Sequence, residues 1–440
     1  MDILFSNVTA VTMDDSMHVY TEAFVGVTDG KISYLSKKAP EEKPGKIIPA
    51  DGMVLLPGLI NCHTHLTDSI LRGYADDLSL GEYLGDHILP RQDKLDGRSA
   101  KAAALISIAE CLRFGVTSVS DMSAFCEEVA EAAAQSGIKA NISSECKLFS
   151  EDFDLEQHEG FRKTEALHDK WHDYDNGRIK IDCAVHAEYT SDHRLWDAIA
   201  EYAINNKLGV QLHLSETKAE QESCMDKYGL TPAQVLDCHH LFDTRSAAAR
   251  CVQLTSEDRA LLAKRGVSAV HCPVADRKYA IGNADVMALV KAGMNVCLGT
   301  ESPAAVGRLD LFEVMKAASL TAKSCAEDAS VLPAAACLMM ATVCGARAQG
   351  REAECGQIRL GMDADLVLLD FSQPHLIPCH NVLSSLVYSA TGHDVVLTMV
   401  RGNILYANGQ YPTIDLASAV NELALYAVPH VFTDEAPSEN

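Results

Sequence analysis

The sequence predicts an α/β fold: a (β/α)₈ TIM-like barrel with a small β-sandwich built from both ends of the chain. Eight short strand patterns alternate with helical segments through the middle of the sequence. Further strand patterns lie on both sides of this region. The 440 residues are enough for one large barrel and one smaller unit.

The first part of the chain, residues 1–55, has the patterns of short strands. Residues 5–13, 23–28 and 32–35 are apolar or alternate between apolar and polar. Asp29-Gly30, between two of these runs, is a typical dipeptide of a two-residue hairpin turn. This β unit is too small to stand alone.

The middle of the chain, residues 56–354, is expected to form the barrel. The strand candidates, most of which end in polar residues, are 59–65, 116–121, 139–145, 179–186, 209–216, 248–255, 267–273 and 295–301. The helices expected between them include 99–114, 126–136, 192–205, 232–238 and 285–292. Eight alternations of strand and helix imply a closed parallel barrel.

Strand patterns return after residue 355, at 363–369, 394–401 and 403–407. The economical arrangement is one β-sandwich composed of residues 1–55 and 355–425. Residues 426–440 are expected to form an acidic, frayed tail.

The composition excludes several classes of function. The net charge of −24, from 37 basic and 61 acidic residues, disfavours nucleic acid and anionic membranes as partners. The 15 cysteines are scattered and form no CxxC pair, which fits free thiols in a reducing cytosol. We find neither a signal peptide nor an apolar run long enough for a membrane span, so the expected location is the cytoplasm.

Candidate metal ligands lie where the expected strands end. His63 and His65 are two residues apart in one strand, so both imidazoles face the same side. An HxH pair alone is a weak signal, but His213 ends another strand and Glu216 follows it, placed to transfer protons. Active residues of such barrels come from the carboxyl ends of the strands.

Three more polar side chains end expected strands. His186 follows the fourth and could contact a substrate, while His271 lies near the end of the seventh. Glu301 ends the eighth, where a carboxylate could complete the coordination of a metal.

Several motifs together resemble those of the amidohydrolase superfamily. They are PGLINCHTH at 57–65, LRGYADD at 71–77, HLSET at 213–217, HCP at 271–273, LGT at 298–300 and GMDADLV at 361–367. The similar branch contains S-adenosylhomocysteine and methylthioadenosine deaminases, guanine deaminase and triazine chlorohydrolases. The resemblance covers essentially the whole chain.

The resemblance implies a mechanism and a set of site residues. One divalent metal, zinc or iron, would be bound by His63, His65, His213 and the carboxylate of Glu301. Glu216 would protonate a ring nitrogen while hydroxide attacks the carbon that bears the amine, and ammonia would leave. The substrate-binding candidates are His186, Arg162, Gln92 and His271. The partner is then a small heterocyclic molecule, and a homo-oligomer is expected, as in many relatives.

The sequence departs from the family pattern at four places. The eighth strand ends in Glu301 where the family has aspartate, which moves the carboxylate by about 1.5 Å. Arg250 replaces a histidine that orients the attacking hydroxide, and a guanidinium cannot act as a base. Residues 275–278 read ADRK instead of SNLK, and Gln92 replaces a glutamate that holds ribose hydroxyls in adenosine-type deaminases.

The first two departures suggest a hypothesis and two alternative functions. Arg250 and Glu301 lie at nearby strand ends and could form a salt bridge at an altered metal site. The leading interpretation is a metal-dependent deaminase of an aminated purine or nucleoside-like heterocycle. The alternatives are a catalytically impaired binding protein, and a chlorohydrolase or aminohydrolase of another heterocycle. Glu216 favours an enzyme, whereas Arg250 and Glu301 favour the binding protein.

Overall fold

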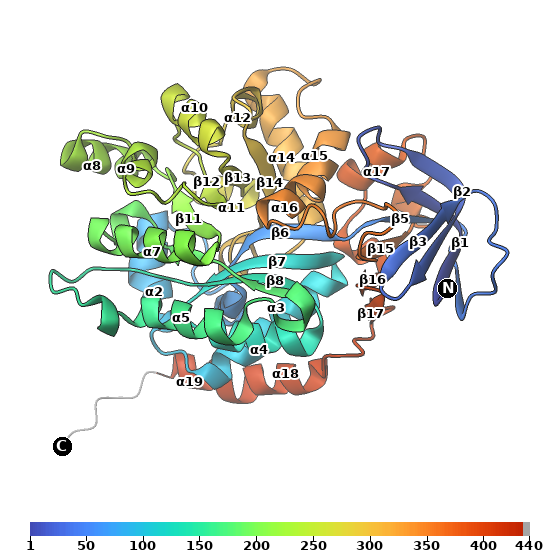
Figure 1. The fold of residues 1–440 in the computed structure, drawn as a ribbon, viewed down its shortest axis with the longest axis horizontal. Coiled ribbons are helices and arrows are strands. Elements are labelled where there is room, and N and C mark those ends of the chain that lie inside the picture. The colour runs from blue at the N-terminus through green and yellow to red at the C-terminus, as the bar shows by residue number, and fades with distance from the viewer. Residues whose placement is uncertain (434–440) are drawn as a thin grey trace.

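Short parallel strands form the centre of the computed structural model, which describes residues 1–433 (Figure 1). One parallel sheet contains β6 (Leu59–Thr64), β7 (Val116–Ser123), β8 (Lys139–Ser144) and β9 (Ile179–Ile181). A second contains β10 (Cys183–Val185), β11 (Val210–Leu214), β12 (Ser246–Arg250), β13 (Ser268–His271) and β14 (Asn295–Leu298). All eight expected strands are therefore present, and the fold is α/β with parallel sheets.

The fourth expected strand is divided into β9 and β10 at Asp182. Its backbone N–H donates to the carbonyl of Ile142, whereas the next N–H, of Cys183, donates to the carbonyl of Gly209. The division thus passes hydrogen bonding from one sheet to the other. At the other edges of the two sheets, the N–H of Glu301, which follows β14, donates to the carbonyl of His63 in β6.

Helices follow most of the parallel strands and lie around them (Figure 1). The five predicted helices correspond to α3 (Gly97–Arg113), α4 (Cys126–Ser136), α7 (His193–Asn206), α9 (Pro232–Cys238) and α12 (Val286–Lys291). Further helices include α5 (Glu159–Trp171), α8 (Lys218–Tyr228), α10 (Ser256–Arg265), α11 (Pro273–Lys278), α14 (Leu311–Ala326), α15 (Ala334–Met340) and α16 (Val343–Ala348). Several begin with a side-chain cap, as Asp96 provides for α3.

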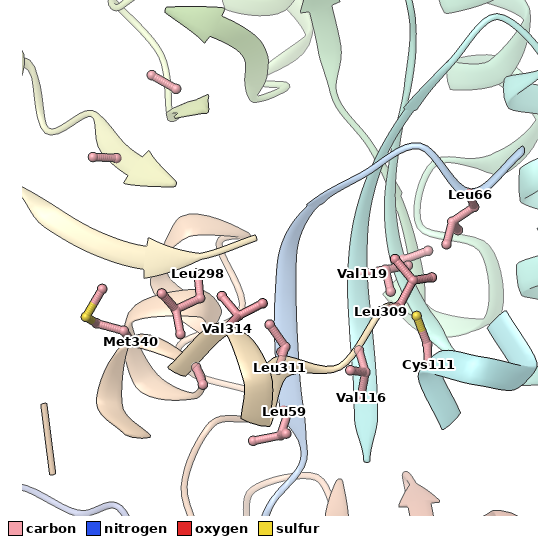
Figure 2. Close-up of a cluster of buried hydrophobic side chains, with 14 of the residues drawn as sticks. Leu59, Leu66, Cys111, Val116, Val119, Leu298, Leu309, Leu311, Val314 and Met340 are labelled. Carbon is pink, nitrogen blue, oxygen red and sulfur yellow. The ribbon is translucent and has the colours of Figure 1, made fainter. Parts of the chain in front are cut away.

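Apolar side chains fill the space between the strands and the helices. Figure 2 shows one part of this core, in which Leu59 of β6 and Val116 of β7 lie near Leu311 and Val314 of α14. These side chains are buried, so they are removed from water and hold the strands in register. Leu298, the last residue of β14, belongs to the same cluster, which keeps the following residues close to β6.

A third, mixed sheet contains strands from both ends of the chain (right side of Figure 1). Its strands are β1 (Ile3–Val11), β2 (Val19–Thr28), β3 (Lys31–Ser36), β4 (Lys46–Pro49), β5 (Met53–Pro57), β15 (Leu366–Asp370), β16 (Val395–Val400) and β17 (Asn403–Ala407). β5 pairs with β1 on one side and β15 on the other, and hydrogen bonds join all eight strands in one sheet. The predicted turn at Asp29-Gly30 is confirmed, since both residues have positive φ angles of 50° and 74°.

One buried lysine joins this mixed sheet to the parallel strands. Lys139, the first residue of β8, lies with its Nζ 2.6 Å from a carboxylate oxygen of Asp363 and 2.6 Å from one of Asp365. Both aspartates immediately precede β15. Removing either partner of such a buried ion pair would leave the other charge buried and unpaired, which is strongly destabilising.

The end of the described chain is helical, which corrects part of the predicted tail. A nearly continuous run of α18 (Leu416–Glu422), a π-helical turn (Leu423–Ala427) and α19 (Val428–Phe432) lies beside α3 (bottom of Figure 1). This run includes the first seven residues of the expected tail, 426–432, because residues such as Ala427 and Val431 are buried against the body. The rest of the predicted tail, 434–440, lies outside the described residues. No helix within residues 1–433 is long and apolar enough to cross a membrane.

Candidate active site

Three imidazoles and one carboxylate converge at the carboxyl ends of β6, β11 and β14. His63, His65, His213 and Glu301 are all buried, and their potential ligand atoms lie within 4.8 Å of one another. The Nε2 atoms of His63 and His213 are 3.0 Å apart. In a tetrahedral zinc site with bonds of about 2.0–2.1 Å, neighbouring ligand atoms are about 3.3 Å apart. The four residues are therefore spaced as metal ligands.

The other ring nitrogens of two histidines face backbone carbonyls. His65 Nδ1 lies 2.8 Å from the carbonyl oxygen of Met122, and His213 Nδ1 lies 2.8 Å from that of His186. A carbonyl only accepts hydrogen bonds, so each Nδ1 carries the hydrogen in these bonds, and in the neutral form that binds a metal each ring turns the lone pair of its Nε2 toward the cluster. Metal-binding histidines are usually held in this way.

The longer carboxylate of Glu301 fits between two imidazoles. Its Oε2 lies 3.0 Å from His63 Nε2 and its Oε1 lies 3.3 Å from His65 Nε2. The buried Oε2 accepts no hydrogen bond of good geometry, so it has capacity for a further ligand. The backbone at Glu301 has a positive φ of 80°, which is uncommon for residues other than glycine.

The charges of the cluster also favour a cation. Burial lowers the pKa of His63 to about 3. Burial acts on His65 in the same direction, but the carboxylates of Glu301 and Asp68 outweigh it and raise its pKa to about 10. Burial would raise the pKa of Glu301, yet Arg250 and the imidazoles hold it well below its usual range. The site therefore attracts positive charge, and its donor set fits a divalent metal.

Arg250, at the end of β12, forms the expected salt bridge with Glu301 and two further ion pairs. Its NH2 lies 3.1 Å from Glu301 Oε2, its NH1 2.9 Å from Asp276 Oδ1 and its Nε 3.2 Å from Glu216 Oε1. The side chain is 2% exposed, and its guanidinium carbon lies 5.6 Å from the centre of the Tyr279 ring. Three buried carboxylates thus surround one guanidinium.

Hydrogen bonds hold both the side chain and the backbone of Glu216 in place. The Tyr189 hydroxyl donates a hydrogen bond of 2.9 Å to its Oε2. The carboxylate of Glu220 accepts hydrogen bonds from the backbone N–H groups of Ser215 and Glu216, at 2.9 and 2.6 Å. These bonds stabilise a turn in which Ser215 has a positive φ of 51°. The turn directs Glu216 toward the cluster.

A cavity of about 880 Å³ opens beside the cluster and reaches His65. A smaller space of about 50 Å³ adjoins it and is lined by His213, Glu216, Arg250 and Glu301, among others. Cavities of this total size hold small organic molecules. At the wall that both spaces share, Gln92 Nε2 donates to Asp68 Oδ1 at 2.8 Å.

The structure brings most, but not all, of the predicted site residues together. Gln92 and His186 line the smaller space with three of the predicted ligands, namely His65, His213 and Glu301. His271 is buried but lines neither space, and its Nδ1 is 3.9 Å from Asp276 Oδ2. Arg162 is exposed on α5 and also lines neither space. Phe161 and Thr164 occupy the buried face of that helix, so Arg162 points to solvent and its predicted substrate contact is not seen.

Three residues of the site were not predicted from the sequence. Asp68 follows His65 by three residues, and Tyr189 follows His186 by three, so their places after a strand end were a usable signal. Asp276 lies in the first turn of α11, and its contact with Arg250 depends on how that helix begins after Pro273.

Comparison with known proteins gives the family. The amidohydrolase family matches residues 54–405. The chain belongs to this family. As an amidohydrolase, it is a hydrolase that acts on C–N bonds.

The relatives of this amidohydrolase are similar over nearly their full lengths. A 5-methylthioadenosine/S-adenosylhomocysteine deaminase of Acetivibrio thermocellus is 37% identical over 418 residues, 94% of this chain and 96% of the relative. A 5′-deoxyadenosine deaminase of Methanosarcina mazei is 37% identical over 423 residues, 96% of each chain.

Among solved structures, an adenosine deaminase from Xanthomonas campestris with bound zinc has a TM-score of 0.91 and 32% identity. It covers 96% of this chain and 97% of its own. Atrazine chlorohydrolase from Arthrobacter aurescens has a TM-score of 0.90 at 22% identity, covering 97% of this chain and 100% of its own, which shows the same fold.

Proposed function

We propose that this amidohydrolase is a divalent-metal-dependent deaminase that releases ammonia from an adenosine derivative. The observation that carries the proposal is the convergence of three imidazoles and Glu301 beside Glu216. The relatives are named as deaminases of methylthioadenosine, S-adenosylhomocysteine and 5′-deoxyadenosine, which supports the substrate class. The adjoining cavity has the volume for a nucleoside-sized molecule.

The proposed metal ligands are His63, His65, His213 and Glu301, with zinc or iron as the ion. A divalent ion held there would supply a water nucleophile of lowered pKa. Glu301 is placed to accept a proton from the nucleophile, because its carboxylate lies within the cluster.

Glu216 transfers a proton to the ring nitrogen next to the carbon that is attacked. Its carboxylate lines the smaller space, and the hydrogen bond from Tyr189 and the ion pair with Arg250 fix its direction. Proton transfer needs a group that keeps its position, and these two contacts supply that constraint. Gln92 and His186 line the space where the substrate ring and its sugar would lie. Arg162 and His271 have no part in this arrangement.

The proposal includes a finer description of the fold. The hydrogen bonds at Asp182 and at Glu301 link the two parallel sheets at both junctions, which supports one closed (β/α)₈ barrel over residues 56–354. The mixed sheet, from residues 1–55 and 355–425, would then form a separate sandwich-like domain. A cytoplasmic homo-oligomer is the accompanying expectation, which sedimentation of the purified chain and cell fractionation would test.

Ammonia release from the zinc-loaded full-length protein tests the function. The substrates are 5′-deoxyadenosine, methylthioadenosine, S-adenosylhomocysteine, adenosine and guanine, with a chlorotriazine as the comparison. Turnover of an adenosine derivative that is lost in Glu216→Gln is the expected result. Binding without turnover, with activity gained in Arg250→His/Glu301→Asp, would instead identify an impaired enzyme that serves as a binding protein. Turnover of the chlorotriazine alone would contradict the substrate class.

A further inference from the structure

Arg250 places a permanent positive charge beside the proposed metal site, and this charge needs a counterpart. The guanidinium contacts Glu301, a proposed metal ligand, at 3.1 Å. A cation this close to a divalent ion raises the free energy of metal binding, most of all in a buried site. Of the carboxylates that contact Arg250, Glu216 and Glu301 alone would balance the two charges of the ion and leave the charge of the guanidinium without a counterpart.

We propose that Asp276 is the positioning residue that allows Arg250 and a divalent metal to share this site. Its carboxylate offsets the guanidinium, so that Arg250, three carboxylates and a divalent ion together carry no net charge. The inference rests on the metal dependence proposed above and extends it to a residue outside the set of four ligands. It also explains how Arg250 can lie at the end of β12, beside strand ends that carry the proposed metal ligands.

The geometry supports this assignment. Asp276 Oδ1 accepts a hydrogen bond of 2.9 Å from Arg250 NH1, while Arg250 NH2 contacts Glu301. The two terminal amino groups of the guanidinium are therefore held by different carboxylates. Asp276 and Arg250 are 0% and 2% exposed, so water screens their interaction little.

The backbone of β12 is strained where it presents the guanidinium. Arg250 and Cys251 have positive φ angles of 79° and 55°, which are unfavourable for non-glycine residues. Such strain persists only when surrounding contacts maintain it, and the ion pair with Asp276 is one of them. Asp276 itself is fixed on α11, which begins at Pro273.

Zinc affinity, measured by competition with a chromophoric chelator, tests the proposal without reference to activity. The proteins are full-length wild type, Asp276→Asn, Arg250→His and Arg250→His/Asp276→Asn. We expect Asp276→Asn to weaken zinc binding by about fivefold or more, and the double variant to regain most of this loss. Arg250→His should bind zinc at least as tightly as wild type, because a positive charge has been removed.

Three results would overturn the proposal: a loss below fivefold in Asp276→Asn, no recovery in the double variant, or a fivefold loss in Arg250→His. If Asp276→Asn does not fold, the zinc affinities of Arg250→His and Arg250→His/Asp276→Asn decide whether the proposal holds. The matched control is Asp182→Asn, another buried aspartate paired with an arginine, Arg245, but remote from the cluster. It should lower stability and leave zinc affinity unchanged. If the variants show the expected zinc affinities but the wild type does not deaminate any of the substrates, only the proposed function is refuted and the role of Asp276 stands.

Discussion

Replacement of Lys139 by methionine tests how the mixed sheet is joined to the parallel strands. The lysine side chain is fully buried, and its Nζ lies 2.6 Å from both Asp363 and Asp365. Methionine retains the length of the side chain but removes the charge. Asp363 keeps Lys31 and Arg401 as partners, whereas the Oδ2 of Asp365 has no other partner. Breaking one side of a buried ion pair costs about 3–5 kcal/mol, which we expect as the loss in the free energy of unfolding.

Urea unfolding of the full-length protein measures this loss. Lys139→Met/Asp365→Asn should recover a large part of it, since the unpaired charge is then removed. Lys31→Met is the matched control: it contacts the same Asp363, but its side chain is 52% exposed, so it should cost no more than about 1 kcal/mol. Zinc affinity should not change, because Lys139 begins β8 and the cluster lies at the opposite ends of the strands. A loss in Lys139→Met no larger than that of the control would refute the reasoning.

Three further predictions concern the site and the dependence of stability on pH. Glu216→Gln should reduce kcat for ammonia release by the zinc-saturated protein by about 100-fold or more, because proton transfer is lost while the four proposed metal ligands remain. Gln92→Leu should raise KM about tenfold with a smaller effect on kcat if this side chain binds the sugar; an unchanged KM would exclude that role. Burial raises the pKa of Asp363, but Lys139 outweighs it and holds the pKa at about 2, below the ordinary 3.8. Asp363 thus contributes about 2 kcal/mol above pH 4, lost as the pH falls toward 2, and Asp363→Asn should flatten this part of the urea-unfolding profile.

The sequence was most informative where local pattern and function coincide. His63 and His65 are two residues apart at the end of one strand and His213 lies near the end of another, so the strand pattern predicted their convergence. The salt bridge between Arg250 and Glu301 was also predicted. Both residues depart from the family pattern, carry opposite charges and lie at the ends of nearby expected strands.

The remaining contacts depend on tertiary geometry that no local pattern contains. Asp276 meets Arg250 only because α11 turns back over the end of β12, and the sequence spacing of 26 residues does not reveal this. Arg162 lies in a helix whose register, set by the burial of Phe161, turns it to solvent. The division of the fourth strand at Asp182 follows from its hydrogen bonds to both sheets, which a strand pattern cannot show.

The position of β5 between β1 and β15 has a consequence for synthesis of the chain. β5 ends at Pro57, but its antiparallel partner begins only at Leu366, so the ribosome must add about 300 residues before they can pair. During that time the N-terminal strands present an open hydrogen-bonding edge, while the parallel strands emerge one after another. We therefore expect the nascent chain to need protection from aggregation until its last quarter has been made, and fragments that stop before residue 366 to be poorly soluble.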